Sequence, residues 1–198
     1  MNSLPGVQCD GEILHAPVFF PRAHVLSSCA KAGAKRAYGC KILSYQLLRV
    51  QPIRSRFDFV RELHDCGFRI LYLRRENLVE HAVSNIRALR HGFHAREGQS
   101  VVKDAIHIDI AELRHWLSGS EQLARFEESA LKSVPHLPLT DEHNLMTAER
   151  QQDTVGEICR YVGLDAASTA RCAFRKVSPT LLRESIQNYD EVAKALAG

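Results

Sequence analysis

The chain has 198 residues, of which 45% are hydrophobic and 25% charged, and its formal net charge is +3. This length and composition are typical of a soluble globular protein, so we expect a single domain over residues 1–198. No apolar stretch is long enough for a membrane span, and no long run of like charge points to a nucleic-acid partner. The first residues do not have the pattern of a secretory leader, so a cytoplasmic location is expected.

The six cysteines and ten histidines are scattered along the chain. No CxxC pair, HExxH motif or Cys/His quartet has the spacing of a zinc site. The sequence therefore predicts reduced, partly buried cysteines and no metal site.

The first segment, residues 4–15, contains two candidates for acid–base chemistry. It reads Leu-Pro-Gly-Val-Gln-Cys-Asp-Gly-Glu-Ile-Leu-His and carries Glu12 and His15. An isolated Gly–Glu pair is more often a solvated loop carboxylate than a catalytic base, so both interpretations of Glu12 stay open.

The next elements are predicted from turn signals and apolar patterns. Two prolines, a glycine and a Ser–Ser pair indicate that residues 16–38 form a loop with at most a short helix. Residues 39–45 have the pattern of a strand. Ser55 begins a predicted helix that Gly67 ends.

A strand that leads directly into a helix is predicted over residues 68–90. Its first half is rich in large apolar residues and ends in two arginines, which indicates a buried, parallel strand. Asn77 can cap the helix, and Arg75, the helix start and Ser84 could then meet at one place, which suits a phosphate. Arginines at strand ends and serines off an apolar face are also common without a ligand, and spacing alone favours that alternative.

Further elements are predicted in the second half of the chain. Residues 106–109 form a short β-like segment, and a helix begins at Asp109. A strand is expected over residues 137–140, and a helix over residues 147–162 ends at Gly163.

A last helix is predicted after the basic segment 174–179. Ser178 is its expected N-cap and Pro179 its first helical residue. The buried stripe of this helix is expected to consist of Leu182, Ile186, Tyr189, Ala193 and Leu196. A basic turn before a helix also occurs without any ligand, so a binding role for the segment is one of two alternatives.

Three separated motifs, taken together and in this order, resemble those of sulfotransferases that use 3′-phosphoadenosine 5′-phosphosulfate (PAPS). They are Leu-Pro-Gly-Val-x-Cys-x-Gly-Glu-Ile-Leu from residue 4, Leu-Arg-Arg-Glu-Asn-Leu-Val-x-x-Ala-Val-Ser from residue 73, and Ile-x-Asn-Tyr-Asp-Glu-Val from residue 186. The similarity is to the bacterial carbohydrate type, which includes the trehalose and nodulation-factor sulfotransferases. It implies an α/β fold of three layers, with a short, mostly parallel sheet flanked by helices, related to the P-loop nucleotide-binding folds.

The resemblance also implies how the cofactor is held. Arg75 and Ser84 match the arginine and serine that bind the 3′-phosphate in that family, and Arg74 is a further candidate. Arg175 and Lys176 fall near a basic loop that closes over the cofactor in related enzymes.

The implied reaction transfers a sulfuryl group from PAPS to a hydroxyl of a carbohydrate or similar small acceptor, without a metal. By motif, Glu12 would be the base that takes the proton from the attacking hydroxyl. His15 is a second candidate for acid–base chemistry.

The chain departs from the family at its start. Family members begin with a strand and a Ser/Thr-containing loop that holds the 5′-phosphosulfate, and neither precedes residue 4 here. Two alternatives are therefore kept: an inactive, truncated sulfotransferase-like protein that binds nucleotide or a partner, and a fragment of a longer gene.

Overall fold

The computed structural model describes residues 4–91, 95–96, 104–165, 174–175 and 182–197. Its contacts group the chain into two compact units. Unit 1 consists of Met1–Arg74 and Leu123–Arg171, and unit 2 of Arg75–Gln122 and Cys172–Gly198. The chain has an α/β fold, as expected, and a single domain over residues 1–198 stays a prediction.

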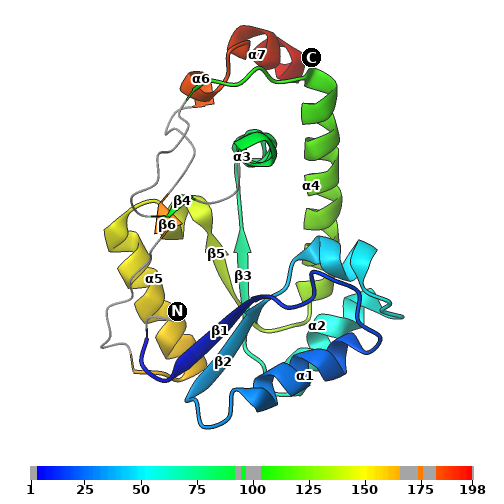
Figure 1. Ribbon diagram of the computed structural model, residues 1–198, viewed down its shortest axis with the longest axis vertical. Helices are drawn as coiled ribbons and strands as arrows, with labels where there is room; N and C mark the ends of the chain where they lie inside the picture. Colours follow the sequence, from blue (N-terminus) through cyan, green and yellow to red (C-terminus); the bar gives the residue numbers. More distant parts are fainter. Residues whose placement is uncertain (1–3, 92–94, 97–103, 166–173, 176–181, 198) are drawn as a thin grey trace. The chain divides into compact units, whose positions relative to one another are not determined.

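The strands of unit 1 pair in parallel (Figure 1). Strand β1 (Val7–Glu12) pairs with β2 (Ala37–Lys41), and β3 (Ile70–Arg74) pairs with β5 (His136–Thr140). Because parallel neighbours need a crossover, helices lie between the paired strands in sequence. The parallel pairing expected for residues 68–75 is confirmed. The burial expected for this strand is wrong, because Leu71 is 39% exposed and Leu73 52%. Over the described residues the strands form separate two-stranded ladders, so one continuous three-layer sheet stays a prediction.

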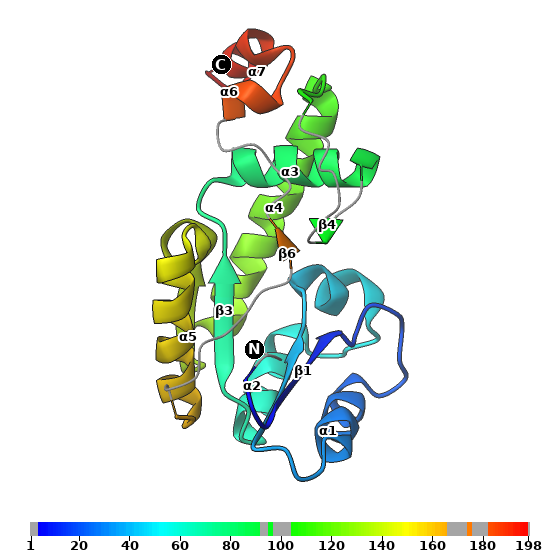
Figure 2. The ribbon, with the colours of Figure 1, turned by 60° about the vertical axis from the view of Figure 1, so that its left-hand side comes forward.

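Helices α1 (Pro21–Lys31) and α2 (Arg56–Asp65) contribute to the core of unit 1, and α1 lies beside the β1–β2 pair (Figure 2). Residues 16–38, expected to be a loop with at most a short helix, contain a longer helix than expected, the 11 residues of α1. Pro21 is the first residue of α1. At this position the fixed φ of proline favours a helix, and the N–H that proline lacks would have no partner within the helix. The core of unit 1 consists of Leu14, Val25, Leu47, Phe59, Leu63, Phe126 and Ala130.

The predicted helix over residues 147–162 is confirmed as α5 (Ala148–Val162). The Thr147 hydroxyl accepts a hydrogen bond from Arg150 N at 3.2 Å. Gly163 ends the helix with φ of 76°, a left-handed conformation that favours glycine. A π-helical turn, η2 (Asp141–Leu145), connects β5 to this helix.

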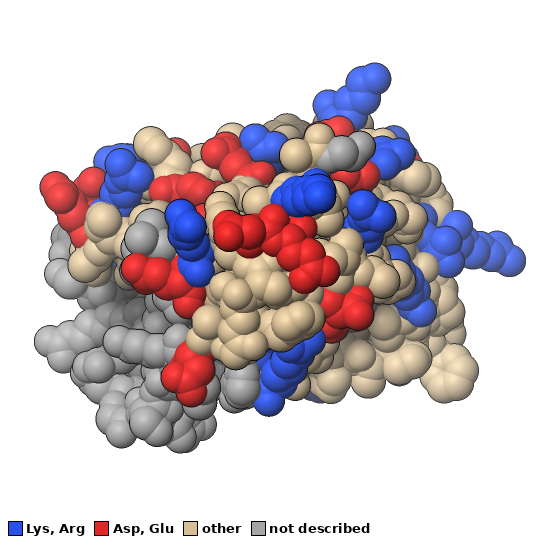
Figure 3. All heavy atoms as spheres, turned by 90° about the horizontal axis from the view of Figure 1, so that it is seen from above, with Lys and Arg blue, Asp and Glu red and all other residues tan. Residues whose placement is uncertain are grey.

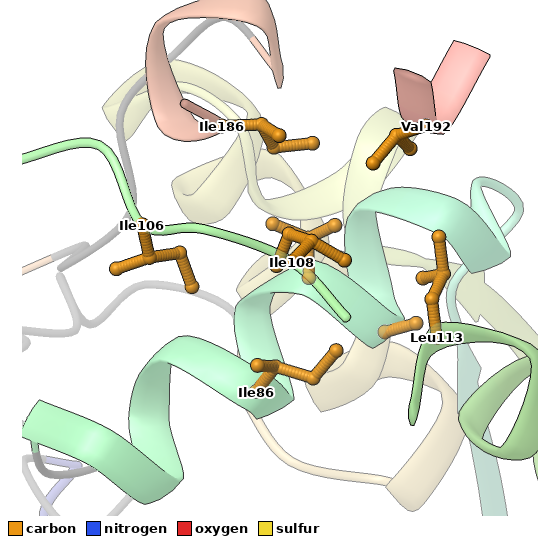
Figure 4. Close-up of a cluster of buried hydrophobic side chains, with 8 residues drawn as sticks. Ile86, Ile106, Ile108, Leu113, Ile186 and Val192 are labelled. Carbon is orange, nitrogen blue, oxygen red and sulfur yellow. The ribbon is translucent and has the colours of Figure 1, made fainter. Parts of the chain in front are cut away.

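Unit 2 contains mostly helices. They are α3 (Leu78–His91), the first part of α4 (Ile110–Leu131), α6 (Leu182–Ser185) and α7 (Tyr189–Ala197). A short antiparallel pair joins β4 (Ala95–Arg96) and β6 (Phe174–Arg175). Figure 4 shows the apolar core of unit 2, which is formed by Ala82, Val83, Ile86, Ile106, Ile108, Leu113, Ile186 and Val192.

The extended segment before α4 is held by side chains of unit 2. Asn188 bonds the backbone of Ile108 twice, accepting from its N–H and donating to its carbonyl, both at 2.9 Å. Arg87 is 2% exposed, and its two Nη atoms donate to the carbonyls of Asp104 at 2.8 Å and Ser185 at 3.1 Å. One buried guanidinium therefore connects the segment before α4 with the last residue of α6.

Two residues of the predicted C-terminal stripe, Ala193 and Leu196, are exposed, so the stripe is wrong at these positions; Leu196 is 40% exposed. Phe57 on α2 and Leu89 on α3 are also exposed, by 54% and 60%. The predicted C-terminal helix is also divided, into α6 and α7, and its expected cap at Ser178 and Pro179 lies outside the described residues. Among the described helices, none is both long and apolar enough to cross a membrane.

Candidate functional site

The junction between β3 and α3 forms as the sequence predicts. The strand ends at Arg74, the helix begins at Leu78, and Asn77 caps the helix. The Asn77 side-chain oxygen accepts a hydrogen bond from Glu80 N at 3.0 Å, and its carbonyl accepts one from His81 N at 3.0 Å. The first turn of α3 is therefore fixed, and its N-terminus carries the partial positive charge of a helix start.

Helix α3 separates an apolar face from a polar one. Its buried face consists of Ala82, Val83 and Ile86, which are at most 3% exposed. Asn77, His81 and Ser84 lie on the other side; Asn77 is exposed and the other two are half-buried. Arg75, just before the cap, is also half-buried. Ser84 thus lies off the apolar face, as helical periodicity predicts.

Glu12 is held at the end of β1 by two donors. The register of the β1–β2 pair shifts between Asp10 and Glu12, and Glu12 stands opposite Lys41. Its Oε1 lies 3.0 Å from Lys41 Nζ, and its Oε2 accepts from Gln46 Nε2 at 3.1 Å. A bulge of this kind re-aims a side chain, and here it places a carboxylate between a cation and an amide.

Gln46 and Gln51, which the sequence analysis did not single out, support Glu12 and the loop after it. Gln46 is fully buried at the start of the π-helical turn η1 (Gln46–Val50), and its Oε1 accepts from Leu43 N at 3.0 Å. Gln51 is 4% exposed and donates to the carbonyls of Leu14 and Ala16, both at 2.8 Å. The only feature of the sequence that could have indicated a buried, hydrogen-bonded side chain here is a glutamine inside a mostly apolar run.

His15 lies beside the backbone of Glu12. Its ring Nδ1 is 2.7 Å from the Glu12 carbonyl oxygen, so this nitrogen is the donor, and its side chain is exposed. The second ring nitrogen stays available for proton exchange in this geometry.

A second carboxylate of unit 1 is held by two hydroxyls. Glu127, on α4, accepts hydrogen bonds from the Ser44 hydroxyl and, at 2.8 Å, from the Tyr72 hydroxyl. Burial, together with the hydrogen bond and negative charge of Glu127, raises the pKa of Tyr72 well above its ordinary value. Tyr72 therefore stays neutral, and the cluster links β3 to α4 and to the residues before η1.

The thiols near β1 and β2 are not activated. Burial, and after it the negative charge of Asp10 and the neighbouring cysteines, raises the pKa of Cys40 to about 11. Tyr38 donates to Asp10 at 3.0 Å, and burial likewise raises its pKa. In the described part of the chain, no group of three or more His, Cys, Asp or Glu side chains could hold a metal ion.

The expected site residues fall in both units. Glu12 and Arg74 belong to unit 1, whereas Arg75 and Ser84 belong to unit 2 and lie on one strand–helix connection. Arg175 lies in β6, also in unit 2, where it stands opposite Ala95. Lys176 lies outside the described residues. A joint site of all these residues stays a prediction.

Comparisons with known proteins do not assign a family. No protein-family model and no curated protein matches the chain. Any functional assignment therefore depends on the residues and their geometry, together with the resemblance of the three motifs.

Proposed function

We propose that the chain is a sulfotransferase-like protein that binds PAPS and transfers its sulfuryl group to a hydroxyl of a carbohydrate or similar acceptor. The observation that carries this proposal is the capped junction between β3 and α3. An arginine comes directly before a fixed helix start, and a serine lies on the polar side of that helix. These are the groups that bind a phosphate. We also propose that the fold is that of the sulfotransferases, which are related to the P-loop nucleotide-binding folds.

In this proposal, Arg75 and Ser84 bind the 3′-phosphate of the cofactor. The guanidinium offers two parallel N–H donors to phosphate oxygens, and the serine hydroxyl offers a third. Arg74, exposed at the end of β3, adds positive charge to the same connection. Arg175 and Lys176 are proposed as further cationic contacts of the cofactor.

The proposed chemistry is an in-line displacement at sulfur. The acceptor oxygen forms a bond to sulfur, the bond from sulfur to the phosphate oxygen of PAPS breaks, and adenosine 3′,5′-bisphosphate leaves with the electron pair. Glu12 takes the hydroxyl proton. Its carboxylate has about four lone-pair sites, so the contacts to Lys41 and Gln46 leave room for an acceptor hydroxyl.

The first test measures binding of adenosine 3′,5′-bisphosphate by calorimetry. We expect Arg75→Ala to weaken binding by about 1.5–3 kcal/mol, because a charge-assisted contact to the 3′-phosphate is lost. Adenosine 5′-monophosphate lacks that phosphate, so its affinity should change little in the same variant. Arg69→Ala is a matched control, because this exposed arginine precedes β3 at its other end.

Two results would contradict the assignment of Arg75. Equal bisphosphate affinity in wild type and Arg75→Ala would remove this residue from the site. An equal loss for both nucleotides would show that Arg75 contacts something other than the 3′-phosphate. If the wild type does not bind the bisphosphate detectably, the proposed function itself is wrong.

The second test concerns the base. With labelled PAPS and a panel of sugar acceptors, we expect Glu12→Gln to lower turnover by about 10²–10⁴-fold, because the proton acceptor is lost. Bisphosphate affinity should stay nearly unchanged. Glu128→Gln, at an exposed position of α4, is the control and should turn over like the wild type.

Turnover of Glu12→Gln within a few-fold of wild type would eliminate Glu12 as the base and make His15 the next residue to test. If the wild type binds the bisphosphate and transfers no sulfuryl group to any acceptor, the non-catalytic alternative is favoured. The ion pair of Glu12 with Lys41 then has a structural role only.

A further inference from the structure

Residues 13–57 of unit 1 carry positive charge without any negative charge. This segment contains eight of the chain's 26 lysines and arginines and none of its 23 acidic residues, although the whole chain has a net charge of only +3. All eight are exposed: Arg22, Lys31, Lys35, Arg36, Lys41, Arg49, Arg54 and Arg56.

Most of this charge is not balanced by neighbouring carboxylates. Arg22, Arg36 and Lys41 form ion pairs, with Glu62, Asp165 and Glu12 respectively. The other five form no ion pair with a described carboxylate. On the face shown in Figure 3, in contrast, basic and acidic side chains lie interspersed.

The same segment exposes large apolar side chains. Phe19 is 91% exposed and Phe20 77%, directly before α1. Residues with exposed apolar side chains continue along the outer face of this helix, at Ala23, Leu26 and Ala30. Only Pro21 and Val25 of the helix are buried, so its water-facing side carries these apolar side chains next to polar and basic ones.

Charge and apolar surface meet on this helix. Arg22 lies at its first turn and Lys31 at its end, and Lys35 follows four residues later. Pro17 and Pro21 flank the two phenylalanines and restrict the backbone that presents them. Exposed phenylalanines and a leucine, flanked by cations in a segment that has no acidic residue of its own, are groups that suit contact with an anionic membrane interface.

We propose that α1 and the loop before it form a docking surface for anionic lipid membranes, with Phe19, Phe20 and Leu26 entering the headgroup–acyl boundary and the surrounding lysines and arginines contacting lipid phosphates. A lipid layer takes up aliphatic and aromatic side chains alike. Nucleic acid would use the rings for base stacking and gain nothing from Leu26 and the two alanines. The attachment is peripheral and reversible, and it does not depend on the proposed function.

The test is co-sedimentation of the full chain with vesicles of phosphatidylcholine mixed with phosphatidylglycerol, compared with phosphatidylcholine alone. We expect binding to the anionic vesicles only, weakening as salt is added. The double variants Phe19→Ser/Phe20→Ser and Lys31→Glu/Lys35→Glu should each bind at least about tenfold more weakly, since one removes apolar area and the other reverses charge.

Two controls match these changes in chemistry. Leu89→Ser removes a 60% exposed side chain from α3, and Lys132→Glu reverses an exposed charge after α4. Both should bind the vesicles like the wild type. Thermal unfolding of every variant checks that the fold is kept, as expected for exposed positions.

Three outcomes would overturn the proposal. They are absence of binding to anionic vesicles, equal binding by the double variants and the wild type, and equal weakening in the two controls. Tight binding of a labelled single-stranded oligonucleotide with the same dependence on Phe19 and Phe20, in the absence of vesicle binding, would assign the surface to nucleic acid instead.

Discussion

Arg87 illustrates how one side chain can hold unit 2 together. It is buried, and its fork reaches the carbonyls of Asp104 and Ser185, which are far apart in the sequence. Burial lowers its pKa below the ordinary value, and the negative charge of Asp104 opposes this shift. Both hydrogen bonds have a charged donor, so their loss costs more than that of neutral ones, although the Ser185 carbonyl keeps a hydrogen bond from Ile106 N at 3.0 Å.

We therefore expect Arg87→Met to lower the free energy of unfolding by about 2–4 kcal/mol. The measurement is denaturant unfolding followed by fluorescence of Trp116, which is the chain's one tryptophan and packs against the core of unit 2. Arg90→Met is the control, because Arg90 is exposed and its ion pair with Glu112 should contribute less than about 1 kcal/mol. If Arg87→Met and Arg90→Met lower the free energy of unfolding equally, burial of the Arg87 guanidinium is not the cause of the loss.

The thiol of Cys40 predicts a dependence of stability on alkaline pH. Its pKa is about 11 in the folded chain and has an ordinary value of 9.0. Between these values the unfolded chain releases the proton and the folded chain keeps it, so stability falls as pH rises from about 9 to 11. Cys40→Ala should reduce this fall, as measured by thermal unfolding across that range. Cys66→Ala removes an exposed thiol and should lose stability with rising pH as the wild type does. If the stability of Cys40→Ala falls with pH as steeply as that of the wild type, the Cys40 thiol is not the source of the fall.

Single residues of the candidate site differ in how far the sequence could predict them. The cap by Asn77 follows from local spacing, because the donor is the N–H three residues later. The support of Glu12 by Gln46 joins residues 34 apart, and no local pattern specifies such a pair. A glutamine can be buried only where the folded chain supplies hydrogen-bond partners for its amide, and local sequence does not show where those partners lie.

At the level of elements, regular patterns with clear ends were predictable. Helix α5 has a threonine cap, an amphipathic pattern and a final glycine, and its bounds differ from the predicted range by one residue. The length of helix α1 was underestimated because its buried face consists of only Pro21 and Val25, so its sequence lacks the usual apolar stripe. The π-helical turns also had no signature, since they depend on contacts such as those of Gln46.

The exposed positions of Leu89 and Phe57 show a limit of periodicity. A stripe in the sequence states which residues share a helix face, not how far the core extends along it. In α3 the buried stripe ends after Ile86 and Arg87, and Leu89 lies beyond it. In α2, Phe57 contacts the ring of Phe126 and still remains more than half exposed.

For the whole molecule, the sequence predicted the α/β class and the parallel pairing of β3, because a short apolar run before a helix is typical of a parallel strand. The division into two units was not predictable. Its boundary falls between Arg74 and Arg75, inside the motif that suggested one continuous site. Domain boundaries usually show as polar linkers, and this boundary lies where a strand passes directly into a helix.

The uneven charge of residues 13–57 also concentrates positive charge in one stretch of unit 1. In the same unit, residues 123–171 carry five lysines and arginines against eight acidic residues, so the two stretches have opposite net charge. A basic surface attracts a polyanion before contact even when the net charge of the protein is small. On a sulfonated ion-exchange matrix the chain should therefore be retained to higher salt than its net charge of +3 alone implies.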